Sequence, residues 1–194
     1  KFNKKSKMVK KRACIFISGS GTNLRSIIKN SRDYNFPINV NLIISNKKNA
    51  KGISYAKKYS IPYIIISNRK NEFEHTALRF VNSKKIELIC LAGFMKILSK
   101  NFIRNYKGKI LNIHPSLLPK FKGLDTFRRV LKSTEKFTGC TVHLVDEKLD
   151  NGKIILKKRV SIEKNFSEER LKQNVQVEEY KAYSEAIRKI YRFS

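Results

Sequence analysis

Short apolar runs alternate with amphipathic segments along most of the chain. Five runs contain no charged residue, which is typical of strands buried on both faces of a sheet. They cover residues 13–17, 40–44, 63–66, 88–91 and 110–113. Between them, apolar residues at helical spacing predict helices over residues 24–30, 52–59 and 72–83. This alternation predicts an α/β domain with a mostly parallel, open, twisted sheet and helices on both faces.

The pattern changes after residue 114. Residues 115–126 predict a long loop with two prolines and a glycine, and residues 127–131 predict a short helix. Two further strands, 140–145 and 154–162, are joined by a tight turn that contains Asn151-Gly152. We expect them to form an antiparallel hairpin or a mixed addition to the sheet. Residues 166–193 predict a charged, amphipathic C-terminal helix.

The 194 residues fit a single domain, which we place at residues 12–194. Residues 1–11 are basic and lack a signal-peptide pattern, so we expect a disordered extension. No apolar run approaches the ~20 residues that cross a bilayer. The three cysteines, Cys14, Cys90 and Cys140, each lie in an apolar run. They predict buried, reduced thiols and a cytoplasmic protein.

The formal charge of +28 reflects 43 lysines and arginines against 15 acidic residues. Such a charge is typical of proteins that bind nucleic acid or anionic membranes. Here the lysines are scattered over the whole chain, and isoleucine and asparagine are abundant as well. We therefore favour a compositional origin and expect no specific nucleic acid or membrane partner. The charge would still attract anionic substrates.

Candidate chemistry begins where the run 110–113 ends. Asn112 and His114 are two residues apart on a predicted strand, so their side chains point the same way. Pro115 then ends the strand, because proline has no N–H for the ladder. An amide donor beside a titratable imidazole suits acyl transfer, in which an oxyanion forms and protons move. A lone strand histidine is more often structural, but the companion Asn112 favours a catalytic pair.

The turn 18–23 joins the first strand to the first helix. Its glycines allow a ligand to approach the backbone, and the N–H groups of Gly21, Thr22 and Asn23 would face an anion. The run lacks the third glycine of the dinucleotide fingerprint and the lysine of a Walker A loop. A single phosphomonoester therefore fits better than a dinucleotide, while an ordinary capped turn explains the run equally well.

Three other features allow two interpretations each. Asp150 lies in a turn, where aspartate is common, but a carboxylate near His114 would raise the pKa of that histidine. The segment 91–98 is either a buried connector or an apolar slot for a flat ring at the sheet edge. We interpret His75 and His143 as structural, although His143 could border the pocket. Histidines this dispersed predict no metal site.

These motifs together resemble the phosphoribosylglycinamide formyltransferases of purine synthesis. The resemblance runs in order over nearly the whole chain and rests on residues 17–24, 91–99, 111–119, 142–146 and 149–152. The block Asn-Ile-His-Pro-Ser-Leu-Leu-Pro is shared with methionyl-tRNA formyltransferase and formyltetrahydrofolate deformylase. The glycine-rich start and the run 123–126 resemble the glycinamide branch. The resemblance implies a Rossmann-like formyltransferase domain.

The resemblance also implies an activity and a set of site residues. It implies formyl transfer from the co-substrate 10-formyltetrahydrofolate to the amine of glycinamide ribonucleotide, with no metal, by a monomer or homodimer. The implied catalytic residues are Asn112, His114 and Asp150. Gly21, Thr22 and Asn23 would bind the substrate phosphate, and Gln176 and Glu179 would bind the rest of that substrate. The implied folate-binding residues are Lys70 or its neighbour Arg69, Met95, Lys96, Ile97, Leu98 and Asn112.

The sequence departs from the family pattern at two positions, and three other functions are alternatives to this one. Lys96 stands where arginine is common, and Lys122 replaces a frequent proline, which we expect to loosen its loop. A tRNA formyltransferase would need an appended RNA-binding domain, for which we expect no residues. A deformylase would use water in place of the amine. A non-catalytic RNA-binding protein would leave the Asn112–His114 pair unexplained.

Overall fold

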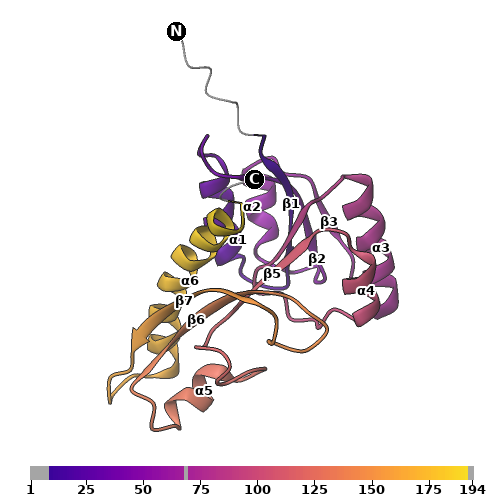
Figure 1. The fold of residues 1–194 in the computed structure, drawn as a ribbon. Coiled ribbons are helices and arrows are strands. Elements are labelled where there is room, and N and C mark those ends of the chain that lie inside the picture. The colour runs from indigo at the N-terminus through magenta and orange to yellow at the C-terminus, as the bar shows by residue number, and fades with distance from the viewer. Residues whose placement is uncertain (1–8, 68–69, 192–194) are drawn as a thin grey trace.

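The centre of the protein is a seven-stranded sheet in the order β3-β2-β1-β4-β5-β6-β7 (Figure 1). The computed structural model describes residues 9–67 and 70–191, with the backbone alone at residues 70 and 71. The strands are β1 (Lys11–Ile17), β2 (Ile38–Ser45), β3 (Tyr63–Ile65), β4 (Leu88–Leu91), β5 (Lys109–His114), β6 (Phe137–Leu144) and β7 (Ile154–Ser161). Strands β1 to β5 pair in parallel, whereas β6 and β7 are antiparallel. The predicted α/β fold with antiparallel additions is confirmed.

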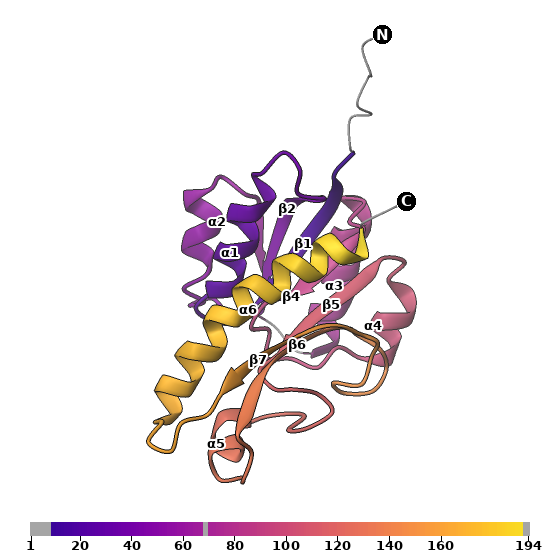
Figure 2. The ribbon, with the colours of Figure 1, turned by 60° about the vertical axis from the view of Figure 1, so that its left-hand side comes forward.

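Helices cover both faces of this sheet because the central strands are apolar on both sides. The helices are α1 (Thr22–Ser31), α2 (Ile53–Lys58), α3 (Lys70–Ser83), α4 (Lys100–Asn105), α5 (Thr126–Leu131) and α6 (Glu168–Ile190). On β1, Ile15 and Ile17 belong to a core shared with α1, α2 and α6. The alternate residues Cys14 and Phe16 belong to a second core with α3 and α4. Figure 2 shows α6 lying across the first of these faces.

From β1 the chain first builds outward through β2 and β3, and it then returns to place β4 on the other side of β1. The strand order therefore reverses between β1 and β4. Ligands of open α/β sheets bind outside the carboxyl ends of the strands at such a reversal. The carboxyl ends of β1, β4 and β5 therefore mark the expected position of a site.

The three cysteines are buried and have free thiols, as predicted. Burial raises the pKa of the Cys140 thiol to about 12. Among the described residues, no helix has the length and hydrophobicity of a membrane span.

The structure adds one helix to the predicted elements and shifts several of their boundaries. Helix α4 was not predicted, because only Phe102 on it is buried and one residue shows no periodicity. Strand β1 already begins at Lys11, which pairs with Ile38, two residues before the predicted run 13–17. Residues 1–8 of the predicted extension lie outside the described residues. Helix α6 begins two residues later than predicted, because Ser167 caps it by accepting a hydrogen bond from the Arg170 N–H.

Tyr183 of α6 fastens the helix to the sheet at the carboxyl edge. Its side chain is fully buried, and its hydroxyl lies 3.0 Å from both the Leu91 and the Leu111 carbonyl oxygens. We expect Tyr183→Phe to lower the free energy of unfolding by about 1–3 kcal/mol, because buried carbonyls lose a donor. Urea denaturation measures this, and Tyr34→Phe, at a 65% exposed position, is the control. Equal stability of the two variants would contradict the anchoring role.

Candidate active site at the carboxyl edge of the sheet

Strands β5 and β6 bring four polar side chains to one face. Asn112 lies opposite His143, and His114 lies opposite Thr141. Residues directly opposite each other on antiparallel strands point to the same side. The Asn112 Nδ2 accordingly lies 3.3 Å from the His143 Nε2, and both histidines are buried. The spacing argument that placed Asn112 and His114 together is consistent with this geometry.

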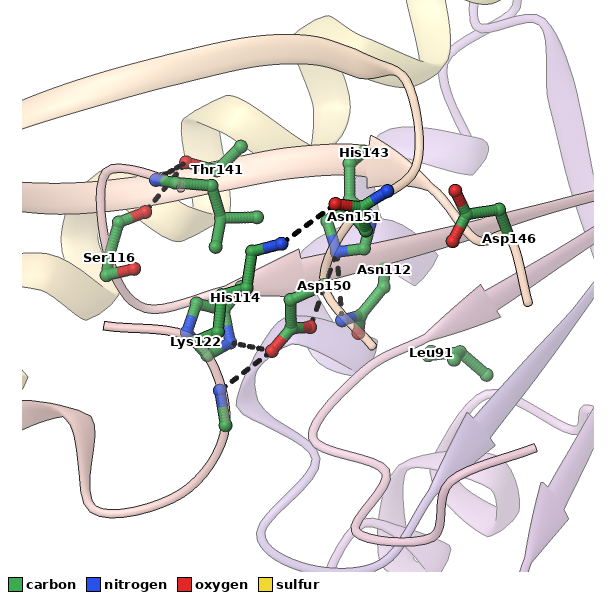
Figure 3. A network of polar contacts seen from close by, with 12 residues as sticks. Leu91, Asn112, His114, Ser116, Lys122, Thr141, His143, Asp146, Asp150 and Asn151 are labelled. Carbon is green, nitrogen blue, oxygen red and sulfur yellow. Dashed lines mark hydrogen bonds and ion pairs between the residues drawn. The ribbon is translucent and has the colours of Figure 1, made fainter. Parts of the chain in front are cut away.

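Asp150 completes a polar cluster with these residues (Figure 3). It lies in the loop between β6 and β7, yet it is only 7% exposed, unlike an ordinary turn residue. Its Oδ2 lies 3.3 Å from the His114 Nδ1 and accepts a hydrogen bond of 2.9 Å from the Gly123 N–H. The backbone of Asp150 is left-handed, with φ of 46°. This conformation is uncommon in residues other than glycine, and aspartate tolerates it better than most.

A glycine makes the close return of this loop possible. A Cβ atom at Gly152 would lie 1.8 Å from the Leu144 carbonyl oxygen. The return is closed by the Leu144 N–H, which donates to the Lys153 carbonyl at 2.9 Å. The Asn-Gly turn of the sequence therefore sets the path of the loop that carries Asp150. Lys122, expected to loosen its own loop, donates from Nζ to the Asn151 Oδ1 and links the two loops.

His143, which the sequence favoured as structural although it could border the pocket, lies in this cluster. Besides Asn112, its Nε2 faces the Asp150 Oδ1 at 3.7 Å. No sequence signal separates His143 from a core residue, since it alternates with Val142 and Leu144 in an apolar run. Only the register of β5 against β6 brings it to Asn112. His75, by contrast, is exposed on α3.

The electrostatics of the His114–Asp150 pair differ from the expectation in one respect. Burial lowers the pKa of His114, and this effect outweighs the Phe121 carbonyl and the Asp150 carboxylate, which both raise it. Burial also acts to raise the pKa of Asp150, but the His143 imidazole, the Gly123 amide and His114 lower it further. Asp150 is therefore an anion at neutral pH. Its negative charge favours the protonated form of His114, although burial keeps the pKa of His114 below its ordinary value.

Both ring nitrogens of His114 face hydrogen-bond acceptors. Its Nε2 lies 2.8 Å from the Phe121 carbonyl oxygen, and its Nδ1 faces the Asp150 carboxylate. A carbonyl oxygen only accepts, so Nε2 carries a proton. A second proton on Nδ1 would complete the contact with Asp150. The two acceptors thus favour the imidazolium form of His114, whereas burial disfavours its positive charge.

The predicted phosphate turn lies at the carboxyl end of β1. Gly21 has a φ of 73°, and a Cβ on it would lie 2.5 Å from the Gly52 Cα, so this position requires glycine. Helix α1 begins immediately after it, with backbone N–H groups that no side chain caps. A cavity of about 260 Å³ next to the turn is lined by Thr22, Arg25, Ser26, Lys29, Tyr55 and Tyr180. Two cations and a helix N-terminus favour an anion here.

Helix α6 brings both of its predicted substrate residues to this turn. The Gln176 Nε2 donates to the Thr22 Oγ1 at 2.9 Å, and the Asn23 Nδ2 donates to the Glu179 Oε2 at 2.9 Å. The two residues are three positions apart, so they lie on one face of the helix. The residues predicted for one substrate thus come together although 154 and 156 positions of sequence separate the two pairs.

Glu179 is a carboxyl group whose folded state disfavours its charge. Burial raises its pKa to about 7, although the Asn23 hydrogen bond acts in the opposite direction. A carboxyl pKa raised by folding lowers stability as the pH rises from the pKa of the unfolded chain to the raised value. We expect Glu179→Gln to increase the free energy of unfolding by about 2 kcal/mol more at about pH 8 than at about pH 5. Denaturant unfolding at the two pH values measures this.

Glu178→Gln is the matched control for that prediction. Glu178 is the neighbouring residue on α6 and forms an ion pair of 2.7 Å with Lys181. Because its charge has a partner at the surface, neutralising it should leave stability unchanged or slightly lower at both pH values. The same gain in both variants would show that the effect does not come from burial of Glu179.

The predicted folate segment follows β4 and lies beside the end of β1. The Met95 N–H donates to the Ser18 Oγ at 2.8 Å, which holds the two turns together. Met95 and Ile97 are 67% and 64% exposed, which is unusual for neighbouring large apolar residues and typical of a binding surface. Leu98 is 7% exposed and packs in the second core.

Of the two lysines predicted to bind folate, the structure describes the side chain of Lys96 but not that of Lys70. The Lys96 Nζ lies 5.2 Å from the Phe73 ring centroid, a cation–π contact at the end of the same segment. Lys70 is the first residue of α3, and its side chain lies outside the described residues, as does Arg69. Among the described residues, no group of three or more His, Cys, Asp or Glu could hold a metal ion.

The match to a known family covers most of the chain. The model of the formyl transferase family matches residues 11–187. The chain belongs to the formyl transferase family. The resemblance inferred from the motifs is thereby confirmed, and the family assignment covers the sheet, the polar cluster and most of α6.

Individual relatives of this formyl transferase point in the same direction. It is 39% identical over 183 residues to the phosphoribosylglycinamide formyltransferase of Haemophilus influenzae, covering 92% of this chain and 86% of that protein. It is 40% identical over 185 residues to the trifunctional purine biosynthetic protein adenosine-3 of Chironomus tentans, but spans only 14% of it. It covers 18% of the length of the human and chicken proteins of the same name.

Solved structures extend the similarity to the fold. The phosphoribosylglycinamide formyltransferase of Brucella melitensis superposes with a TM-score of 0.89 at 36% identity, covering 96% of this chain and 98% of that one. That of Bacillus halodurans superposes with a TM-score of 0.87 at 36% identity, covering 93% and 95%. The parallel sheet and its antiparallel additions are therefore those of this family.

Proposed function

We propose that this protein transfers the formyl group of 10-formyltetrahydrofolate to the amine of N1-(5-phospho-D-ribosyl)glycinamide, a step of purine synthesis. The observation that carries the proposal is the convergence of the Asn112 amide, the His114 imidazole and the Asp150 carboxylate at the carboxyl edge of the sheet. This cluster lies in a chain that matches phosphoribosylglycinamide formyltransferases over nearly its whole length.

The acceptor substrate would bind between the β1–α1 turn and α6. Its phosphate would accept hydrogen bonds from the backbone N–H groups of Gly21, Thr22 and Asn23 at the N-terminus of α1. Arg25 and Lys29 line the neighbouring cavity and would add positive charge. Gln176 and Glu179 lie beside this turn and would bind the ribose or the glycinamide. The amine would then extend toward β5.

The formyl donor would bind against the segment that follows β4. Exposed Met95 and Ile97 offer apolar contact to a pterin ring, and the partly buried Lys96 lies between them in sequence. Asn112 pairs with Leu91 at the end of β4, next to this segment, so it can reach the formyl oxygen and the folate. The positive charge of the protein would favour the carboxylates of the folate tail.

The cluster can perform the transfer by direct attack of the amine. The amine nitrogen bonds to the formyl carbon, and the resulting oxyanion is stabilised by the Asn112 amide and a protonated His114. The bond between the formyl carbon and the folate nitrogen then breaks. The proton lost by the amine reaches the leaving nitrogen through His114 or a water molecule. Asp150 orients His114 and favours its protonated form, while the Phe121 carbonyl would compete for the proton on Nε2.

An assay with and without the acceptor tests the proposal. Purified protein is mixed with 10-formyltetrahydrofolate, and release of tetrahydrofolate is followed with and without glycinamide ribonucleotide. Release only in the presence of the ribonucleotide supports the transferase. Equal release in its absence would replace the proposal with a deformylase, in which water takes the place of the amine. No release under either condition would contradict formyl transfer to this acceptor.

A further inference from the structure

The hydrogen bonds around His143 determine where its protons are. Its Nδ1 lies 2.9 Å from the carbonyl oxygen of Leu144. A carbonyl oxygen only accepts, so the proton of the neutral ring is on Nδ1. Its Nε2 then carries a lone pair, and this lone pair faces the Nδ2 of Asn112 at 3.3 Å. The neutral ring is therefore an acceptor for the Asn112 amide.

We infer that His143 is a positioning residue that fixes the orientation of the Asn112 amide for the proposed formyl transfer, on which this inference rests. An asparagine amide presents NH₂ on one side and a carbonyl oxygen on the other. With one Nδ2 proton bound to His143, the amide cannot exchange these two sides. The second Nδ2 proton remains available for the oxyanion. A rotated amide would present its oxygen to the developing negative charge and repel it.

Within the described part of the chain, His143 is the side-chain partner of the Asn112 amide. The residue is 2% exposed, so water does not reach the contact freely. Its position opposite Asn112 follows from the register of β5 against β6. Its Nε2 also lies 3.7 Å from the Asp150 Oδ1, so the 3.3 Å contact with the Asn112 Nδ2 is the shorter of the two. A protonated Nε2 would instead attract Asp150 and turn the Asn112 amide around.

Two substitutions at position 143 separate this role from a structural one. His143→Leu removes the acceptor, and we expect kcat to fall about 10-fold, as for the loss of one buried hydrogen bond. The KM for glycinamide ribonucleotide should stay unchanged, because its predicted contacts lie at the β1–α1 turn. His143→Gln offers an amide oxygen to Asn112 and should restore most of kcat. His75→Leu, at an exposed position of α3, is the control and should match the wild type.

The wild-type protein provides a readout that does not depend on activity. Nitrogen NMR of histidine-labelled protein should show His143 protonated on Nδ1 and unprotonated on Nε2 at the pH of the assay. The opposite tautomer or an imidazolium would overturn the inference. So would a His143→Leu variant with wild-type kcat, or a folded His143→Gln variant as slow as His143→Leu. An inactive wild-type protein would contradict the proposed function instead, while the tautomer would still test the hydrogen bond to Asn112.

Discussion

Replacing His114 with alanine is expected to lower kcat for formyl transfer by about 10²–10⁴-fold, the range for a positioned acid–base group. His114 is the residue of the cluster that can carry a proton between the amine and the folate nitrogen. It is buried, and Asp150 and Phe121 hold both of its ring nitrogens. Bulk water therefore cannot take over its role efficiently. Single-turnover kinetics with saturating substrates measures the chemical step separately from product release.

The control for this variant is His75→Ala. His75 is exposed on α3 and lies outside the cluster, so its replacement should leave the single-turnover rate unchanged. Thermal unfolding of both variants checks that His114→Ala retains its fold. A folded His114→Ala protein with near-normal single-turnover transfer would remove the imidazole from the mechanism.

Replacing Asp150 with asparagine is expected to lower kcat at neutral pH by about 10²-fold, with a much smaller effect on substrate binding. The amide can still accept the hydrogen bond from the Gly123 N–H, so the loop should keep its position. What it loses is the negative charge beside His114. The Asp150 carboxylate is one of the groups that raise the pKa of His114 against burial, so the pKa falls further in the variant.

The sign of this change gives a pH test. A lower pKa of His114 means that less imidazolium is present at a given pH. The decline of kcat on the alkaline side should therefore begin at a lower pH in Asp150→Asn than in the wild type. Asp146→Asn is the control, because Asp146 lies in the same loop and, within the described residues, accepts a hydrogen bond from the Lys148 N–H and none from the cluster. If kcat and its pH profile are unchanged in Asp150→Asn, Asp150 has no part in proton control.

Local sequence information was sufficient for the sheet and for one pair of the cluster. The apolar runs predicted the first five strands because most of these residues pack in the two cores, although the edge strand β3 is partly exposed. The two-residue spacing placed Asn112 beside His114. These predictions use the geometry of a single strand or helix. They need no knowledge of which elements are neighbours. Gln176 and Glu179 were indicated by the family resemblance alone.

The remaining contacts depend on tertiary structure. Asp150 reaches His114 only through the return of its loop at Gly152, and His143 reaches Asn112 only through the register of two strands. The net lowering of the His114 pKa follows from burial, which a nearby carboxylate in the sequence does not reveal. The burial of Leu98 likewise follows from its packing in the second core. For these reasons the sequence motifs indicated which residues take part in the chemistry, but not how those residues contact one another.

Tracing the formyl carbon tests the central claim most directly. The donor is 10-formyltetrahydrofolate labelled at the formyl carbon, and the products of a single turnover with glycinamide ribonucleotide are separated. Direct attack by the amine predicts that the label appears in the formylated ribonucleotide, at the rate at which tetrahydrofolate is released. Label found in free formate, with the ribonucleotide unmodified, would contradict the account.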